Sequence, residues 1–293
     1  MARVHCLYRR PPRWRRPSFI AGLALGLLAL ASGSLRAEDR SALQTYHPWG
    51  RFPPGSWTQL RQLTETLDAA GRVVSVSSTE TRTTLEQVTA DGVTLKVEVT
   101  VELAGKRLAN PPQTIRQGYA DQSPGQTISL KQLGAAEVAV DGKKIPCQAE
   151  QLEIIGGGQR RMVSVNYSDA RPHILRKVST SSSLPSGATT SELTAEVIAL
   201  DMPYKILNDI KQVSLVKTVQ KQEGTTITVS VHAEAVPGEI VSHTSKKLDT
   251  AGHLVRRSTL ELIDYRVETS EPRAADETRR SRRHQEKGRS PRR

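Results

Sequence analysis

Cysteine and aromatic residues are scarce in this chain of 293 residues, and their scarcity limits how it can be stabilised. Cys6 and Cys147 are its two cysteines, and Cys6 lies in an N-terminal segment with the pattern of an export signal. Once that segment is removed, no intramolecular disulfide can form. Phe and Trp are absent between Thr58 and Val267, so the core must consist of Val, Ile and Leu with few Tyr. We expect Cys147 to be a buried, inert thiol, with an intermolecular disulfide or a reactive thiol as alternatives.

Sequence motifs of common catalytic sites are also missing. The chain has no Gly-x-Ser-x-Gly elbow, no phosphate-binding glycine-rich loop before a helix, no His-Glu-x-x-His and no Cys-x-x-Cys. The glycines at 156–158 precede an alternating segment, which predicts a hairpin tip rather than a phosphate cradle. We therefore expect no cofactor and no catalytic residues. An enzyme whose site is assembled from scattered residues is the alternative.

Positive charge is concentrated at the two ends of the chain. The net charge is +12, of which residues 1–37 contribute seven Arg with no acid, and residues 273–293 contribute nine Lys and Arg against three acids. Residues 38–272 are therefore nearly neutral. A basic protein often binds nucleic acid, but a neutral body between two basic ends argues against that partner.

The N-terminal end, residues 1–37, has the layout of a secretory signal peptide. A basic stretch reaches Arg16, an apolar run follows at 19–31, and small residues come next. The run is shorter than the ~20 apolar residues that span a bilayer. We expect cleavage after Ala37, or near 31–33, and export to the periplasm or the extracellular space with no transmembrane helix left. An uncleaved membrane anchor is the alternative.

The body alternates between apolar and polar residues, the period of half-buried strands. Residues 93–103 are the clearest case, because Val and Leu alternate there with Thr, Lys and Glu. Glycine-containing turns separate such segments at 68–71, 91–92, 141–142, 156–158, 223–224, 237–238 and 249–252. Short connections favour antiparallel neighbours.

These patterns predict an all-β fold over residues 45–270, built from serial hairpins as one large curved antiparallel sheet or an incomplete barrel. Two segments depart from the strand pattern. Residues 109–126 contain Pro and Gly and predict a long loop or crossover. Residues 204–210 are the best candidate for a helical turn.

His232 and His243 are the weak candidates for a metal site. A hairpin centred on Pro237 and Gly238 would place the two rings opposite each other across the strands. Two ligands are too few to hold a metal, so two solvated histidines are the simpler interpretation.

The C-terminal residues 271–293 are rich in Arg and contain no aliphatic residue other than Ala. Such a segment buries too little apolar surface to offset the entropy of ordering, so we expect a disordered basic tail. Behind an export signal, residues 273–293 suit an anionic envelope surface rather than nucleic acid. The alternative is a tail that only keeps the protein soluble.

Several segments of the body resemble uncharacterised exported bacterial proteins rich in β-strands, namely 52–57, 64–68, 102–106 and 196–204. More remotely, residues 143–175, with a Cys-bearing strand, a Gly turn and Tyr167-Ser-Asp169, are similar to the central hairpins of periplasmic lipoprotein-carrier proteins. Those carriers shelter acyl chains in a curved open sheet. The resemblance implies an open-barrel fold and supports function only by analogy.

We therefore expect an exported, non-catalytic envelope protein whose sheet shelters a hydrophobic ligand or docks an envelope protein. If the sheet curves, its inner face should be rich in Val and Leu. A hydrolase with a dispersed active site and a purely structural surface protein are the alternatives.

Overall fold

The computed structural model describes residues 43–169 and 172–269. The predicted signal peptide, residues 1–37, and the predicted tail, residues 271–293, lie outside the described residues, so both stay predictions. The described residues include one helical turn, at 43–46, and are otherwise dominated by strands. None of their helices has the length and apolar content of a membrane span.

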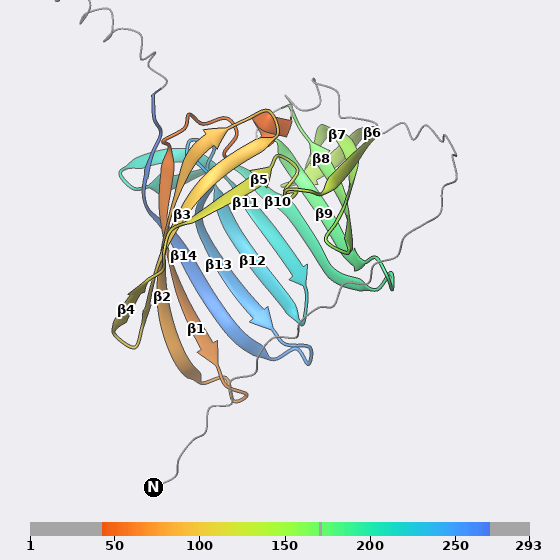
Figure 1. Cartoon of the computed structure of the whole chain (residues 1–293). Helices are drawn as coiled ribbons and strands as arrows, with labels where there is room; N and C mark the ends of the chain where they lie inside the picture. Colours follow the sequence, from red (N-terminus) through yellow and green to blue (C-terminus); the bar gives the residue numbers. More distant parts are fainter. Residues whose placement is uncertain (1–42, 170–171, 270–293) are drawn as a thin grey trace, which may run out of the picture. The chain divides into compact units, whose positions relative to one another are not determined.

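The strands of the described chain belong to one antiparallel sheet (Figure 1). In chain order they are β1 (Trp57–Leu67), β2 (Val73–Val88), β3 (Gly92–Leu103), β4 (Lys106–Ala109), β5 (Gln113–Gly118), β6 (Thr127–Val140), β7 (Lys143–Gly156), β8 (Gln159–Tyr167), β9 (Ile174–Ser183), β10 (Thr189–Ile206), β11 (Asp209–Lys221), β12 (Thr225–His232), β13 (Ile240–Leu248) and β14 (Leu254–Arg266). Their order across the sheet is β4-β3-β2-β1-β14-β13-β12-β11-β10-β9-β8-β7-β6, with β5 also paired to β3. The predicted all-β fold is confirmed, and the sheet does not close into a barrel.

Turn chemistry explains why the hairpins fall where the sequence predicts them. Asp68 and Asp249 fold two of the turns alike, because each carboxylate accepts the backbone N–H groups two and four residues further on, at 2.9 Å. Such side-chain bonds stabilise a turn in place of a backbone pair. Both turns lie on one rim of the sheet, where the β9–β10 and β11–β12 turns also lie.

The two ends of the sheet curve toward each other. Side chains from β2 and β3, near one end, pack with side chains from β7 and β8, near the other, in a single buried cluster. Its aliphatic members on these strands are Leu85, Val93, Leu95, Leu152, Ile154, Val163 and Val165. A second cluster lies along the central strands and includes Ile206, Val213, Val231, Val241 and Leu262. Cys147 is buried, as predicted.

Two expectations from the sequence were wrong. Residues 109–126 are not simply a loop, since β5 lies within them and pairs with β3 from Gly92 to Val97, while β4 pairs with the other end of β3. The long β3 thus offers its free edge to two short strands. Residues 204–210 form no helical turn, because β10 continues to Ile206 and pairs with β11 through two register shifts. Pairing along the neighbouring strand overrides the local preference.

Candidate ligand-binding face

Antiparallel pairing shows which side chains share a face of the sheet, because directly opposite residues point to the same side. Leu85 on β2 lies opposite Leu95 on β3, and both belong to the cluster between the two ends of the sheet. The face that carries them is therefore turned inward. We call it the inner face, and the opposite side the outer face.

The outer face of the central strands is strongly charged. Arg61 on β1 lies opposite Glu80 and Glu261 and reaches their carboxylates at 3.0 and 3.7 Å. Glu65, four residues further along β1, binds the guanidinium of Arg257 on β14. Exposed ion pairs of this kind contribute little to stability. They mark this side as one that faces water.

The inner face of the same strands carries few charges, and its composition changes in rows. A row here is a set of directly opposite residues on neighbouring strands. The row nearer the buried clusters comprises Gln62, Leu260, His243, Ser230, Val216 and Val197. The next, the hydroxyl row, comprises Thr64, Ser258, Ser245, Thr228, Thr218 and Ala195. The last, the rim row, comprises Thr66, Arg256, Lys247, Thr226, Gln220 and Leu193.

The expected Val and Leu therefore cover only part of the inner face. They dominate β3, where Val97, Val99 and Val101 are half-buried. On β1 and on β11 to β14, Ser and Thr take much of their place, and within the hydroxyl row Thr228 donates a hydrogen bond to Ser245 at 3.1 Å. The face is accessible, mixed in polarity and free of acids along these three rows.

Residues 43–55, which we call the plug, cover the rim of the sheet opposite the rim that carries the Asp68 and Asp249 turns. It is anchored on the β12–β13 connection, where Gly238 donates its N–H to the Pro48 carbonyl at 3.1 Å. Arg51 donates to the Glu234 carbonyl at 2.7 Å and pairs with the Glu239 carboxylate at 2.8 Å. Burial raises the pKa of Glu239, but His232 and Arg51 outweigh that effect, so the pKa lies below its ordinary value.

A cavity of about 130 Å³ lies between the plug, the loop at 119–121 and strands β7 to β9. Its walls are aliphatic on the side of the sheet, and its polar lining comes from His47, Asp121 and Lys177. At roughly 30 Å³ per water molecule in the liquid, it could hold a few waters or a small group of a ligand. Aliphatic walls with a few convergent polar groups are typical of small-molecule sites.

His47, one of the residues that line this cavity, has an unsatisfied polar atom. The ring is 4% exposed, and its Nδ1 accepts the backbone N–H of Trp49 at 3.2 Å. Burial lowers the pKa of His47, which favours the neutral ring, and with Nδ1 accepting, the proton must reside on Nε2. Nε2 has no hydrogen-bond partner among the described residues. His47 therefore keeps one buried donor without a partner in a residue that lines the cavity.

Asp121 holds the loop that joins the two ends of the sheet. Its carboxylate accepts hydrogen bonds from Lys177 of β9 at 2.5 Å and from Gln117 of β5 at 2.8 Å. Its carbonyl accepts a bond from Arg161 of β8 at 2.8 Å. Burial raises the pKa of Asp121, but Lys177, Gln117 and His47 outweigh it and the pKa is lowered. A charged Asp121 thus links β5 to β8 and β9.

Tyr167 also lines the cavity, and its phenol stays protonated. Its ring stacks on Tyr46 of the plug at 4.9 Å between centroids. Burial, together with Glu150, Asp121 and Tyr46, raises its pKa well above the ordinary value. The phenol is therefore suited to packing and hydrogen bonding rather than to acting as a base.

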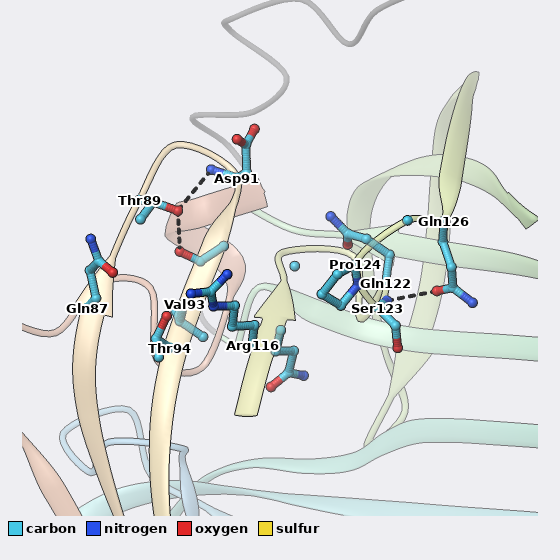
Figure 2. A pocket seen from close by; sticks show the side chains of 14 residues that line it. Gln87, Thr89, Asp91, Val93, Thr94, Arg116, Gln122, Ser123, Pro124 and Gln126 are labelled. Atoms are coloured by element: carbon cyan, nitrogen blue, oxygen red, sulfur yellow. Dashed lines mark hydrogen bonds between the residues drawn. The ribbon is translucent and has the colours of Figure 1, made fainter. Parts of the chain in front are cut away.

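A larger hollow of about 460 Å³ lies beside this cavity and differs from it in chemistry. Figure 2 shows the β2–β3 turn, with Thr89 and Asp91, on one side and the loop from Gln122 to Gln126 on the other. Arg116 of β5 lines the hollow between them. Seven of its fourteen lining residues carry a hydroxyl or a side-chain amide, whereas aliphatic residues of the sheet line the smaller cavity.

The two predicted metal candidates do not face each other across the strands. In the β12–β13 register Ser230 lies opposite His243, while His232 lies opposite Ile240 after a shift at Val231. The long connection at 233–239 produces this offset, which the Pro-Gly dipeptide alone did not reveal. No group of three or more metal-ligating side chains occurs among the described residues. The metal site stays a prediction.

Ser230, His232 and Glu239 instead form a chain with the order of a hydrolase triad. The Ser230 hydroxyl lies 2.9 Å from His232 Nε2, and His232 Nδ1 lies 4.0 Å from Glu239. However, the Ser230 hydroxyl is buried and donates to the Val216 carbonyl at 3.3 Å. Its proton then points away from the histidine, which acts as a donor. We interpret this chain as a polar network within the sheet.

Comparison with solved structures finds proteins of the kind that the sequence resembles. A LolA superfamily protein from Nitrosomonas europaea is 12% identical, with a TM-score of 0.34 over 79% of this chain and 94% of that protein. An outer membrane lipoprotein-sorting protein domain from Vibrio parahaemolyticus is 13% identical, with a TM-score of 0.32 over 81% and 92% of the two chains. An exported protein with a YmcC-like fold from Bacteroides fragilis is 13% identical, with a TM-score of 0.31 over 73% and 98%.

The predicted resemblance to lipoprotein-carrier proteins is therefore confirmed. Similarity at this level carries no argument about function, which has to rest on the geometry of this chain. Scans against protein-family models and curated proteins found no match.

Proposed function

We propose that the protein is an exported, non-catalytic envelope protein that shelters a hydrophobic ligand on the inner face of its sheet. The difference in charge between the two faces carries this proposal. The outer face holds the ion pairs of Arg61 and Arg257, whereas the three inner rows contain no acid. A surface that is curved, accessible and, behind the Arg256 and Lys247 side chains of its rim row, without Lys, Arg, Asp or Glu along these rows suits apolar groups, which bind where water is excluded.

The aliphatic-walled cavity beside the plug supports the same proposal. It lies at the end of the inner face, because Val165 and Lys177, which line it, are opposite each other and continue the hydroxyl row beyond Ala195. A ligand on the inner face can thus place one end in the cavity, among its aliphatic walls. Export is supported by the signal-like residues 1–37.

Native mass spectrometry of the purified protein, before and after organic extraction, tests the proposal. We expect wild-type protein to carry an extractable apolar molecule. Val99→Arg places a charge on the inner face of β3 and should abolish its binding. Thr100→Arg places the same charge on the outer face of the same strand and should leave binding intact.

An extractable molecule bound equally by both variants would place binding outside the inner face and contradict the proposal. Turnover of ester substrates that is lost in Ser230→Ala would support a hydrolase instead. If the protein carries no extractable ligand and turns over no ester, the result would support a purely structural protein or one that docks a partner.

The domain boundaries and the tail belong to the proposal as well. We propose that residues 1–37 are removed on export, that residues 45–270 form the sheet domain, and that residues 273–293 contact an anionic envelope surface. Cosedimentation with anionic liposomes should fall when residues 273–293 are deleted and at ~0.5 M salt, where the Debye length is only a few Å. Equal binding by the full and shortened chains would show that the tail serves solubility alone.

A further inference from the structure

Two cations face each other on the inner face at the turn-bearing rim. Lys247 on β13 and Arg256 on β14 are directly opposite in the register, beside the turn at 249–252. Like charges directly opposite on one face of a sheet are destabilising. Lys246 and Arg257, one position further from the turn on each strand, are also opposite each other, but on the outer face.

The inner pair differs from the outer pair in its partners. Arg257 is bound to Glu65, whereas among the described residues neither Lys247 nor Arg256 has an ion pair. In the rim row, Thr66 flanks Arg256 and Thr226 flanks Lys247. The acid of the adjacent turn, Asp249, is already engaged by its own backbone and by His253. Nothing in the sheet therefore compensates the inner pair.

The rows behind this pair change from polar to apolar with distance from the rim. The hydroxyl row comes first, and Leu260 and Leu262 of β14 lie beyond it. Arg256 and Leu262 are six residues apart on one strand, which at ~3.4 Å per residue is roughly 20 Å. The inner face thus offers cations at its mouth and aliphatic side chains at a depth that a long alkyl chain can reach.

We propose that Lys247 and Arg256 bind the anionic head group of an amphiphile whose apolar chain lies along the inner face. This inference rests on the proposed function and adds the chemistry of the ligand. A phosphate or carboxylate between the two cations would relieve their mutual repulsion and accept charge-assisted hydrogen bonds from both. The ligand class is an acyl chain with a single anionic head, such as a lysophospholipid.

Binding of two probes of equal chain length tests this proposal on the full chain. Palmitoyl lysophosphatidylglycerol carries an anionic phosphate, and monopalmitoylglycerol carries none. Wild-type protein should bind the anionic probe more tightly, by about tenfold or more for two charge-assisted contacts. Inorganic phosphate alone should not compete at equal concentration, because it lacks the chain.

The matched variants neutralise two cations each. Lys247→Gln with Arg256→Gln should remove the preference for the anionic probe and leave binding of monopalmitoylglycerol unchanged. Lys246→Gln with Lys217→Gln changes the net charge equally on the outer face and should keep the preference. Since the inner double variant removes a repulsion, its Tm should not fall, so lost binding cannot reflect unfolding.

Three results would overturn the inference in distinguishable ways. If wild type binds the two probes with equal affinity, the proposal that the inner face shelters a ligand would stand, but the proposed head-group site would be contradicted. An equal loss in both double variants would assign the effect to overall charge. Failure of both probes to bind would contradict the proposed function itself.

Discussion

His47 belongs both to the plug and to the lining of the cavity. Nδ1 accepts the Trp49 N–H within the plug, Nε2 is buried without a partner among the described residues, and the residue lines the cavity. Protonation of Nδ1 would break the first bond and place a charge in a buried position. The residue therefore makes the plug sensitive to acid.

We expect the free energy of unfolding to fall as pH drops from the ordinary histidine pKa of 6.5 toward the lower pKa of folded His47. In that window the unfolded chain binds a proton that the folded protein does not. Tm measured at pH 7.5, 6.5 and 5.5 should decline less in His47→Asn than in wild type. Parallel curves for the two proteins would show that His47 does not titrate in this range.

Asp121 gives a second prediction at the residue scale. Asp121→Asn removes the charge partner of Lys177, and because both side chains are partly exposed, at 39% and 27%, we expect a loss of about 1–2 kcal/mol rather than the 3–5 kcal/mol of a fully buried pair. The control is Asp209→Asn, whose partner Lys211 is 3.8 Å away and whose side chain is 71% exposed; it should cost less than ~0.5 kcal/mol. Similar losses in chemical denaturation would contradict a special role for Asp121.

The lowered pKa of Asp121 also fixes the sign of its pH dependence. Its stabilisation is present above the ordinary value of 3.8 and is lost as pH falls through the lower folded value. Asp121→Asn should therefore flatten the acid limb of the stability curve. If Asp121→Asn loses as much stability at acid pH as wild type does, that loss must come from other carboxylates such as Glu239.

At the scale of elements, the plug depends on one glycine of the β12–β13 connection. Gly238 has a φ of +81°, and a Cβ there would lie 2.9 Å from the Trp49 ring. Gly252 has a similar φ of +88° with nothing within 4 Å of a built Cβ. The two positions share the backbone strain but differ in the contact.

Gly252→Ala should therefore cost about 1 kcal/mol, the strain of a positive φ, and Gly238→Ala should cost more, roughly 2–3 kcal/mol. Hydrogen exchange should rise in residues 43–55 only in the Gly238 variant. Equal costs in the two variants, with no change in the plug, would show that the Trp49 contact does not hold it.

Elements with a strong turn were predictable, and elements without one were not. An Asp-Gly turn and an Asp-x-x-Gly turn locate the β2–β3 and β13–β14 hairpins. In the first the Thr89 hydroxyl accepts the Asp91 N–H, and in the second the Asp249 carboxylate accepts the Ala251 N–H. By contrast, β4 and β5 are short, mostly exposed strands. They form because the edge of β3 is unpaired, which is information from elsewhere in the chain.

At the scale of the whole molecule, the alternation of apolar and polar residues predicted which side chains share a face of the sheet, but it did not predict the cavity at the end of the inner face. The period-two pattern of residues 93–103 separates Val from Lys and Glu, as the structure does. The cavity was missed because His47, Asp121 and Lys177 come from three distant segments that meet only when the two ends of the sheet curve together. No local spacing encodes that meeting.

The cationic rim was likewise hidden in the sequence. Lys246-Lys247 and Arg256-Arg257 are two dibasic pairs on consecutive strands, and only the register shows which member of each faces inward. A one-residue slip would exchange the two faces. The register is therefore the property on which both proposals depend.

Photo-crosslinking with a palmitic acid that carries a diazirine near the end of its chain tests the central claim most directly. If the inner face shelters the apolar chain, mass spectrometry should locate adducts on alternate residues of β3 and β14, at Val97, Val99, Val101, Leu260 and Leu262. Adducts on the intervening outer residues Lys96, Glu98 and Thr100, or no saturable adduct at all, would contradict the claim that this face binds a hydrophobic ligand.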